Sequence, residues 1–244
     1  MNKFLISIIG CLLLFSSCKS ISVQNKKHQT TTEQLALGSV GLDKNFVLEK
    51  TYDHIGIPNY YKPIKLYVNL IPFDKTIFRA FEKANALQPA KLNLNYIDSL
   101  NTKPTFLNIQ AIDRIDLMQM LNDNENKNVK NYMMNQKESH VVSSVSIVFE
   151  EKTMQQIVTA EEVFLEHSGI KSYTLNLYTN KALVKTIHFN EGVVFSYRTS
   201  SACWKEDEKY KMQIVDLVEG NNKCPSNTYK SAKQAKKKIN YYKF

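Results

Sequence analysis

Alternating apolar and polar residues mark the first clear strand of the chain. The stretch 64–71, bracketed by two prolines, has an apolar residue at every second position, and prolines are typical of strand ends. A helix is expected next, because Asp74 stands at an N-cap position and apolar residues recur after it at helical spacing. The pattern therefore predicts a strand over residues 64–71 and a helix over residues 75–86.

Two short strands and a second helix are predicted in the following segment. Apolar runs at 92–97 and 105–109 are separated by a turn-like stretch, and Asp113 can cap the helix that comes after them. The asparagine-rich stretch 122–128 does not fit a calcium loop, because Lys127 stands where an EF-hand needs an oxygen ligand. We expect a solvated loop there.

A period of two dominates from Ser139 onward and predicts the main part of a sheet. Residues 151–160 are expected to form one helical turn or a broad connection before a short strand at 162–166. Three alternating runs joined by short turns then predict an antiparallel meander. The runs cover residues 173–177, 183–189 and 193–197.

A lysine-rich helix is predicted at the end of the chain, after a strand over 210–218. Pro225 and Ser226 can open this helix, which is expected to run to about Tyr242. Its apolar stripe is narrow, which favours docking on a sheet over insertion into a membrane. Its lysine side is a candidate for contact with an anionic surface, with a plain solvated face as the alternative. The candidate contact residues are Lys230, Lys233, Lys236 and Lys237.

Together these elements predict an α+β fold. We expect a mainly antiparallel sheet of about seven to nine strands, with a C-terminal meander and two or three packed helices. The chain has 244 residues, and the elements from residue 46 to residue 244 fit a single domain.

The first eighteen residues have the order of a secretory signal peptide. A positive start at Lys3 is followed by an apolar run over residues 4–15, and two serines precede Cys18. The run is shorter than the about 20 residues that span a bilayer. With a cysteine at the cleavage position, the segment resembles the lipobox signal of bacterial lipoproteins, with Phe15 where that pattern usually has leucine. The resemblance implies that residues 1–17 are removed and that Cys18 carries fatty acids such as palmitate. An ordinary signal peptide or an uncleaved anchor is the alternative.

The same resemblance implies a location. Lys19 follows the cysteine, in place of the aspartate that retains lipoproteins at the inner membrane, so the outer membrane is expected, with the domain facing the periplasm. Residues 18–45 are polar and lack a sustained apolar period. We expect a flexible, lipid-anchored tether there, with an irregular arm packed on the domain as the alternative.

Charge and missing motifs restrict the function classes. Removing residues 1–17 takes away one lysine and no acid, which lowers the formal net charge from +9 to +8. This charge favours anionic partners such as phospholipid head groups or acidic polymers, and it is too small to indicate nucleic acid. The chain has no phosphate-binding loop, dinucleotide fingerprint or nucleophile elbow, so no nucleotide is expected. The five histidines lack metal-binding spacing, and neither a metal nor a cofactor is predicted.

Two aromatic features are weaker functional candidates. The carboxylates at 206–208 lie near Trp204 and can line a sugar-binding groove, but a solvated loop is favoured because neighbouring carboxylates on a strand point to opposite faces. The pairs Tyr60–Tyr61 and Tyr241–Tyr242 are not explained by an apolar stripe and are candidates for a binding rim.

A disulfide is predicted between Cys203 and Cys224. These two cysteines remain once the signal segment is removed and Cys18 is acylated, and the compartment outside the cytoplasm permits their oxidation. Such a bond would fasten the last helix to the sheet. A reactive thiol pair or two separate buried thiols are the alternatives, and the spacing lacks the C-x-x-C form of a redox site.

The sequence as a whole predicts a membrane-anchored envelope lipoprotein, acting as a non-catalytic binding or structural component. Its expected partners are the membrane, through the N-terminal lipid, and an envelope protein, anionic lipid or cell-wall polymer. The alternatives are an envelope hydrolase with a site assembled from dispersed residues, and a carrier of a small ligand.

Overall fold

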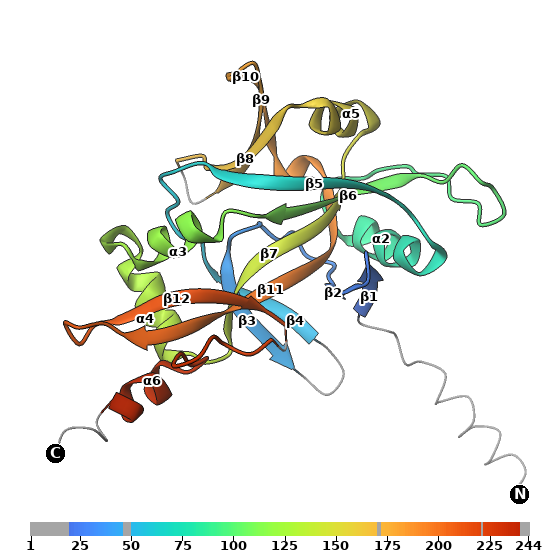
Figure 1. Ribbon diagram of the computed structural model, residues 1–244. Helices are drawn as coiled ribbons and strands as arrows, with labels where there is room; N and C mark the ends of the chain where they lie inside the picture. The colour runs from blue at the N-terminus through green and yellow to red at the C-terminus, as the bar shows by residue number, and fades with distance from the viewer. Residues whose placement is uncertain (1–19, 46–49, 170–171, 221, 240–244) are drawn as a thin grey trace, which may run out of the picture.

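The computed structural model describes residues 20–45, 50–169, 172–220 and 222–239 (Figure 1). Over these residues, five α-helices and twelve antiparallel strands form the predicted α+β fold. The strands are β1 (Ser20–Val23), β2 (Lys26–Thr30), β3 (Val40–Asn45), β4 (Lys50–Gly56), β5 (Ile64–Pro72), β6 (Thr105–Ala111), β7 (Ser139–Val148), β8 (Glu162–His167), β9 (Tyr173–Thr179), β10 (Ala182–His188), β11 (Val193–Glu206) and β12 (Met212–Glu219). The α-helices are α2 (Lys75–Leu87), α3 (Arg114–Asn122), α4 (Lys127–Asn135), α5 (Glu151–Thr159) and α6 (Ala232–Ile239), with short 3-10 helices η1 (Asn124–Asn126) and η2 (Phe189–Glu191).

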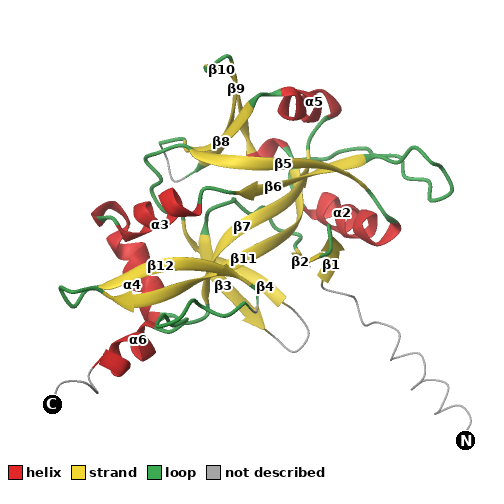
Figure 2. Cartoon of the chain, in the orientation of Figure 1, coloured by secondary structure: helices red, strands yellow, loops and turns green. Residues whose placement is uncertain are grey.

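The twelve strands join into one strongly twisted sheet (Figure 2). Its main path runs β1-β2-β11-β7-β6-β5-β8-β9-β10, while β12 pairs with β11 and β3 pairs with β4 and β7. β11 ties the sheet together, because its 14 residues pair with β7, β2 and β12. Helices α2 and α6 pack on β11, α3 packs on β12, and α5 lies against β5.

Helix α2 forms as the sequence predicts. The Asp74 side chain accepts a hydrogen bond of 2.7 Å from the backbone N–H of Ile77, which is the expected N-cap contact. Phe73, directly before the cap, lies with its ring centroid 4.9 Å from that of Phe106 and 5.7 Å from that of Phe195. These aromatic contacts fix α2 to the centre of the sheet.

Several other local predictions are confirmed. The strand expected at 64–71 is β5, and the Asp113 side chain caps α3 by accepting a 3.1 Å hydrogen bond from the N–H of Asp116. The segment from residue 151, expected to form one helical turn or a broad connection, forms the longer nine-residue helix α5 before the predicted strand β8. Each of these elements is specified by residues close together in the sequence.

The expectation that residues 18–45 form a flexible tether is wrong for residues 20–45. β1 and β2 form a hairpin, and β3 pairs with β7 in the centre of the sheet. Ile21, Val23 and the loop residues Leu35 and Leu37 are at most 5% exposed. The apolar residues of this segment are few but nearly all are buried, so its polar composition hides a folded part of the domain. Cys18 lies outside the described residues.

The predicted meander is correct for two of its three strands. β9 and β10 form a hairpin, but β11 leaves β10 and pairs with β7 instead. The connection contains η2 rather than a tight hairpin turn. Gly192 then passes so close to β7 that a Cβ atom there would lie 2.6 Å from the Val148 carbonyl oxygen. This close approach directs β11 into the centre of the sheet.

Two segments differ from the predicted secondary structure, and in both an asparagine side chain bonds the backbone of another segment. Residues 92–97 form no strand, because Asn85 on α2 bonds both the N–H and the carbonyl of Leu92, each at 2.9 Å. The expected solvated loop at 122–128 instead forms η1 and the start of α4. Asn126 is 2% exposed there and bonds the backbone N–H and carbonyl of Asn59.

The last helix begins later than predicted. Residues 225–231 are not helical, and α6 starts at Ala232. The reason is that Tyr229 pairs with Trp204 on β11 through two backbone hydrogen bonds of 2.7 and 3.0 Å. None of the helices in the described ranges is long and apolar enough to cross a membrane.

Candidate binding site

A band of polar side chains crosses one face of the central strands. Directly paired residues of an antiparallel sheet project to the same face, and the register pairs Asn108 with Ser146 and Ser146 with Ser196. The next row pairs Gln110 with Ser144 and Ser144 with Arg198. All of these residues except Gln110 are buried. The polar face of β7 is therefore covered by protein.

The β1–β2 hairpin provides this cover. Its turn residue Gln24 accepts a 3.2 Å hydrogen bond from Asn69 on β5, and its buried His28 lies 3.3 Å from the Ser196 hydroxyl through Nδ1. Burial, with smaller contributions from the positive charges of Arg198 and Lys26, lowers the pKa of His28 to about 3. The imidazole is therefore neutral at ordinary pH, and it has a structural role beside a fully buried serine.

Arg198 is the buried charge of the polar band. Its side chain is 7% exposed, and Nη1 donates a 2.6 Å hydrogen bond to the carboxylate of Glu219 at the end of β12. Nη2 donates to the Gln110 side chain at 3.2 Å, while Nε has no hydrogen-bond partner among the described residues. Arg198 thus neutralises Glu219 and holds β6, β11 and β12 together.

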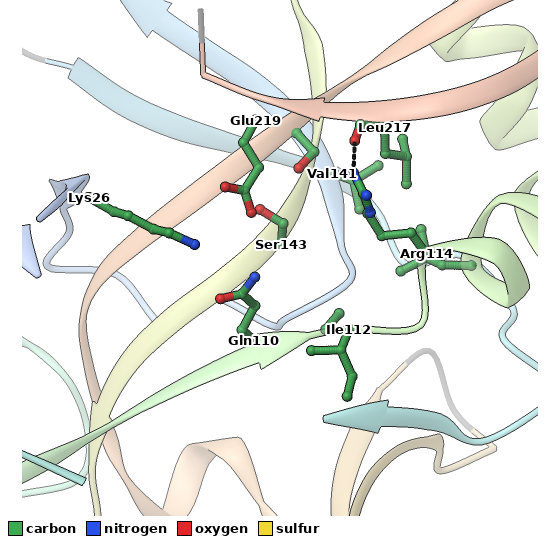
Figure 3. A pocket seen from close by; sticks show the side chains of 11 residues that line it. Lys26, Gln110, Ile112, Arg114, Val141, Ser143, Leu217 and Glu219 are labelled. Carbon is green, nitrogen blue, oxygen red and sulfur yellow. Dashed lines mark hydrogen bonds between the residues drawn. The ribbon is translucent and has the colours of Figure 1, made fainter. Parts of the chain in front are cut away.

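A cavity of about 290 Å³ opens beside this ion pair (Figure 3). Its polar wall comes from five strands and α3, and its apolar wall from α3, β7, β12 and the end of β6. The polar lining residues are Lys26, Gln110, Arg114, Ser143, Ser200 and Glu219. Figure 3 shows the side chains of Lys26, Gln110, Ser143 and Glu219 converging on the same space. The volume is at the small end of ligand sites, which suits a small molecule or one unit of a polymer.

The electrostatic balance of the cavity favours an anion. Glu219 is already paired with Arg198, whereas the side-chain amine of the exposed Lys26 has no hydrogen-bond or ion-pair partner within the described ranges. Arg114 donates to the Leu217 carbonyl at 3.2 Å and lies 3.8 Å from Asp216, with 61% of its side chain exposed. The Lys26 amine is therefore fully available to a ligand, and the exposed Arg114, which Asp216 partly offsets, is available in part. Among the residues described, no group of three or more metal-ligating side chains occurs.

A hydroxyl–imidazole pair lies outside this cavity. The Ser201 hydroxyl is 3.1 Å from Nδ1 of His140, an arrangement that a hydrolase can use. Their strand neighbours Ser200 and Val141 line the cavity, and successive residues of a strand point to opposite faces. The pair consequently faces away from the cavity.

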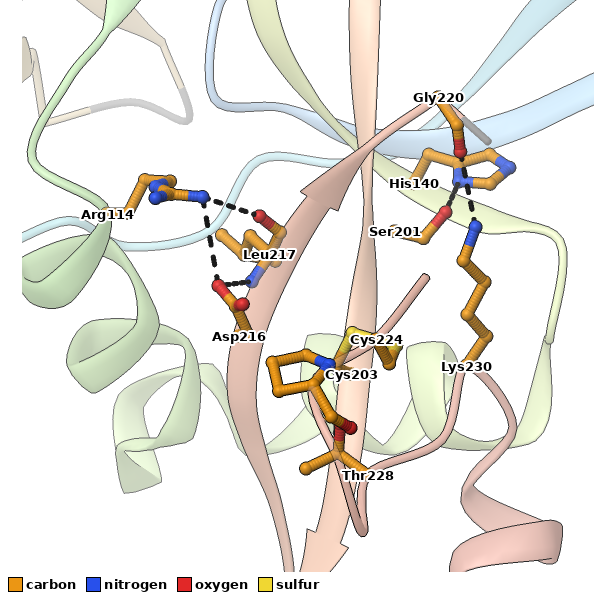
Figure 4. The surroundings of a disulfide bond; sticks show 11 residues. Arg114, His140, Ser201, Cys203, Asp216, Leu217, Gly220, Cys224, Thr228 and Lys230 are labelled. Carbon is orange, nitrogen blue, oxygen red and sulfur yellow. Dashed lines mark hydrogen bonds and ion pairs between the residues drawn. A yellow bond between two sulfur atoms is a disulfide. The ribbon is translucent and has the colours of Figure 1, made fainter. Parts of the chain in front are cut away.

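The predicted disulfide is present. Cys203 on β11 is bonded to Cys224, with the two Cα atoms 5.7 Å apart (Figure 4). The bond anchors the segment that leads into α6, together with the backbone pairing of Tyr229 and Trp204. It fastens the C-terminal part of the chain to the sheet, as expected.

The lysines predicted to meet an anionic surface are only partly brought together. Lys233 and Lys236 are exposed on α6, while Ala232 and Ala235 on its other side are buried. Lys230 precedes the helix and donates a 3.2 Å hydrogen bond to the Gly220 carbonyl. The side chain of Lys237 lies outside the described residues.

Two of the aromatic candidates, Trp204 and Tyr60, are buried. Trp204 is 2% exposed, so the sugar-binding groove suggested by its position is wrong. Tyr60 is also 2% exposed, donates to the Gly38 carbonyl at 2.8 Å and stacks on Tyr173. Its neighbour Tyr61 is 52% exposed and donates to Asp123. The pair Tyr241–Tyr242 lies outside the described residues.

The cavity was the functional feature that the sequence did not reveal. Alternation in β7 placed Ser144 and Ser146 on one face, but Lys26 and Arg198 reach that face from strands distant in sequence. Comparison with family models, curated proteins and solved structures gave no match. The functional interpretation therefore depends on the geometry of the cavity.

Proposed function

We propose that this chain is a membrane-anchored envelope lipoprotein that binds an anionic group, without catalysis, in the cavity beside Arg198. The N-terminal segment ending at Cys18 supports the anchor through its resemblance to a lipobox signal. The cavity supports the binding role. A carboxylate or phosphate group is the expected ligand chemistry, and acidic cell-wall polymers and small periplasmic metabolites both carry such groups.

The observation that carries the binding role is the unpaired amine of Lys26 pointing into the cavity. Because Arg198 neutralises Glu219, an incoming anion meets the charge of Lys26 and that of Arg114, which Asp216 at 3.8 Å offsets in part. The Gln110 amide and the serine hydroxyls of the wall can add neutral hydrogen bonds. Hydrolysis is less well supported, since Glu219 is the one carboxylate among the lining residues and the Ser201–His140 pair faces elsewhere.

Removing the two available cations should weaken anion binding. In the double variant K26Q/R114Q, the affinity for inorganic phosphate or for muramyl peptides is expected to fall at least about tenfold, since each charge-assisted hydrogen bond contributes about 1.5–3 kcal/mol. Isothermal titration calorimetry on the full chain measures the effect. Lys209, exposed in the turn after β11, provides the matched control K209Q, which should bind like the wild type. Equal affinity of K26Q/R114Q and wild type, or no binding of either probe by the wild type, would contradict the proposed site.

Replacing Cys18 by alanine should remove the membrane anchor. The C18A variant is expected to lose all labelling by an alkyne-tagged fatty acid and to leave the membrane fraction or remain unprocessed. Mutating Cys11, which lies within the apolar segment, to alanine is the control and should leave labelling intact. Equal labelling of C18A and wild type would end the lipoprotein proposal.

A further inference from the structure

We propose that the outer face of α2 lies on anionic phospholipid head groups of the membrane that holds the chain. This α2 face consists of Lys75, Arg79, Lys83 and Leu87, which are all exposed. The inference rests on the proposed acylation of Cys18. It identifies which surface of the domain the anchor brings against the bilayer.

The distance between the anchor and the fold is short. β1 begins at Ser20, two residues after Cys18, and an extended chain spans at most about 3.6 Å per residue. Covalent geometry therefore allows at most about 7 Å between the Cα atoms of residues 18 and 20. β1 is itself fixed, because it pairs with β2 and buries Ile21 and Val23. An acylated Cys18 would hold the β1 end of the domain directly on the membrane surface.

Helix α2 is the helix next to this end. It contacts β1 and packs on β11, and Figure 1 shows it beside the β1–β2 hairpin. Its buried side chains are Ile77, Phe78, Phe81 and Ala84. The α2 face lies on the opposite side of the helix and is therefore exposed close to the anchored end of the domain.

The chemistry of the α2 face fits an anionic membrane surface. Its four residues follow one another at a spacing of four and form one ridge along the helix. The first three are basic, and Leu87 at the end is 71% exposed. Lys75 and Arg79 have no ion-pair partner within the part of the chain that the structure describes. A basic ridge of this kind is attracted to anionic head groups, and the exposed Leu87 at its end can enter the interface.

The geometry disfavours the lysine-rich helix α6 as the membrane contact. Figure 1 shows α6 at the opposite end of the molecule from β1. Lys233 and Lys236 on α6 therefore lie farther from the anchored end of the domain than the α2 face does. The anionic-surface contact that the sequence placed on the last helix is thus assigned to α2.

Tryptophan quenching in vesicles tests this arrangement. The full-length acylated protein is reconstituted in vesicles of phosphatidylethanolamine and phosphatidylglycerol, some of whose lipids carry brominated chains. The native Trp204 is buried and gives a constant background. We expect the added emission of L87W to be strongly quenched by the brominated lipids, and that of the matched variant K236W on α6 to be quenched little.

Charge variants separate attraction from simple proximity. In the L87W background, K75Q/R79Q/K83Q should reduce the quenching, and so should raised ionic strength, whereas K233Q/K236Q should leave it unchanged. If acylated L87W floats with the vesicles but is quenched no more than K236W, the α2 face is wrong while the anchor stands. If the protein is not acylated and does not float, the lipoprotein proposal and this inference both fail.

Discussion

Replacing Arg198 by methionine should destabilise the domain by about 3 kcal/mol. Removing one partner of a buried ion pair typically costs about 3–5 kcal/mol, because the other charge is left uncompensated. The lower end applies here, because 29% of the Glu219 side chain is exposed and water can screen part of its charge. The change also removes the hydrogen bond to Gln110. Urea unfolding followed by the emission of Trp204 measures the loss.

The chain offers a matched control for this substitution. Arg114 also approaches an acid on β12, at 3.8 Å from Asp216, but its side chain is 61% exposed. An exposed ion pair contributes about 0–1 kcal/mol, so R114M should change the free energy of unfolding by less than about 1 kcal/mol. Equal effects of R198M and R114M would show that burial does not govern the Arg198–Glu219 interaction.

Loss of the Cys203–Cys224 bond should destabilise the domain by a similar amount. The two residues are 21 positions apart, and closing a loop of this size is worth about 3 kcal/mol by the chain-entropy model. For a domain of about 200 residues this lowers the melting temperature by about 6–12 °C. The double variant C203A/C224A and the wild type with reductant should melt at the same lowered temperature.

Adding reductant to C203A/C224A controls for unspecific effects of the reductant and should leave the melting temperature of this variant unchanged. Cys203 is fully buried, so the reduction must be checked by a mass increase of about two daltons before the melting curve is interpreted. A fully reduced wild type that melts with the oxidised protein would show that the bond does not stabilise the fold.

The sequence predicted those elements whose determinants are local. The cap at Asp74 and the apolar stripe after it are sufficient for α2, and the alternation over 64–71 is sufficient for β5. The disulfide followed from cysteine counting, and it is present.

The missed elements depend on partners far away in the sequence. β1 and β2 contain only two large apolar residues, Ile21 and Val23, so their composition alone indicates a polar segment. They belong to the sheet because β1 pairs with β2 and β2 pairs with the distant strand β11. The short connection after β10 resembled a hairpin turn, but the approach of Gly192 to Val148 sends β11 elsewhere. The cavity depends on both of these placements, since Lys26 comes from β2 and Ser200 from β11. No pattern within a single segment contains that information.

β2 can take its place in the sheet only late in synthesis, because its partner β11 lies far along the chain. His28 meets Ser196 across 168 positions of the chain, so the N-terminal hairpin finds its place only after β11 has been synthesised. Pairings of such long range carry a large loop-closure cost and make folding slow. Before β11 is available, the hairpin of β1 and β2 lacks the strand that it joins in the sheet. The cavity therefore cannot form before β11 and β12 have been synthesised, because Ser200, Leu217 and Glu219 line it.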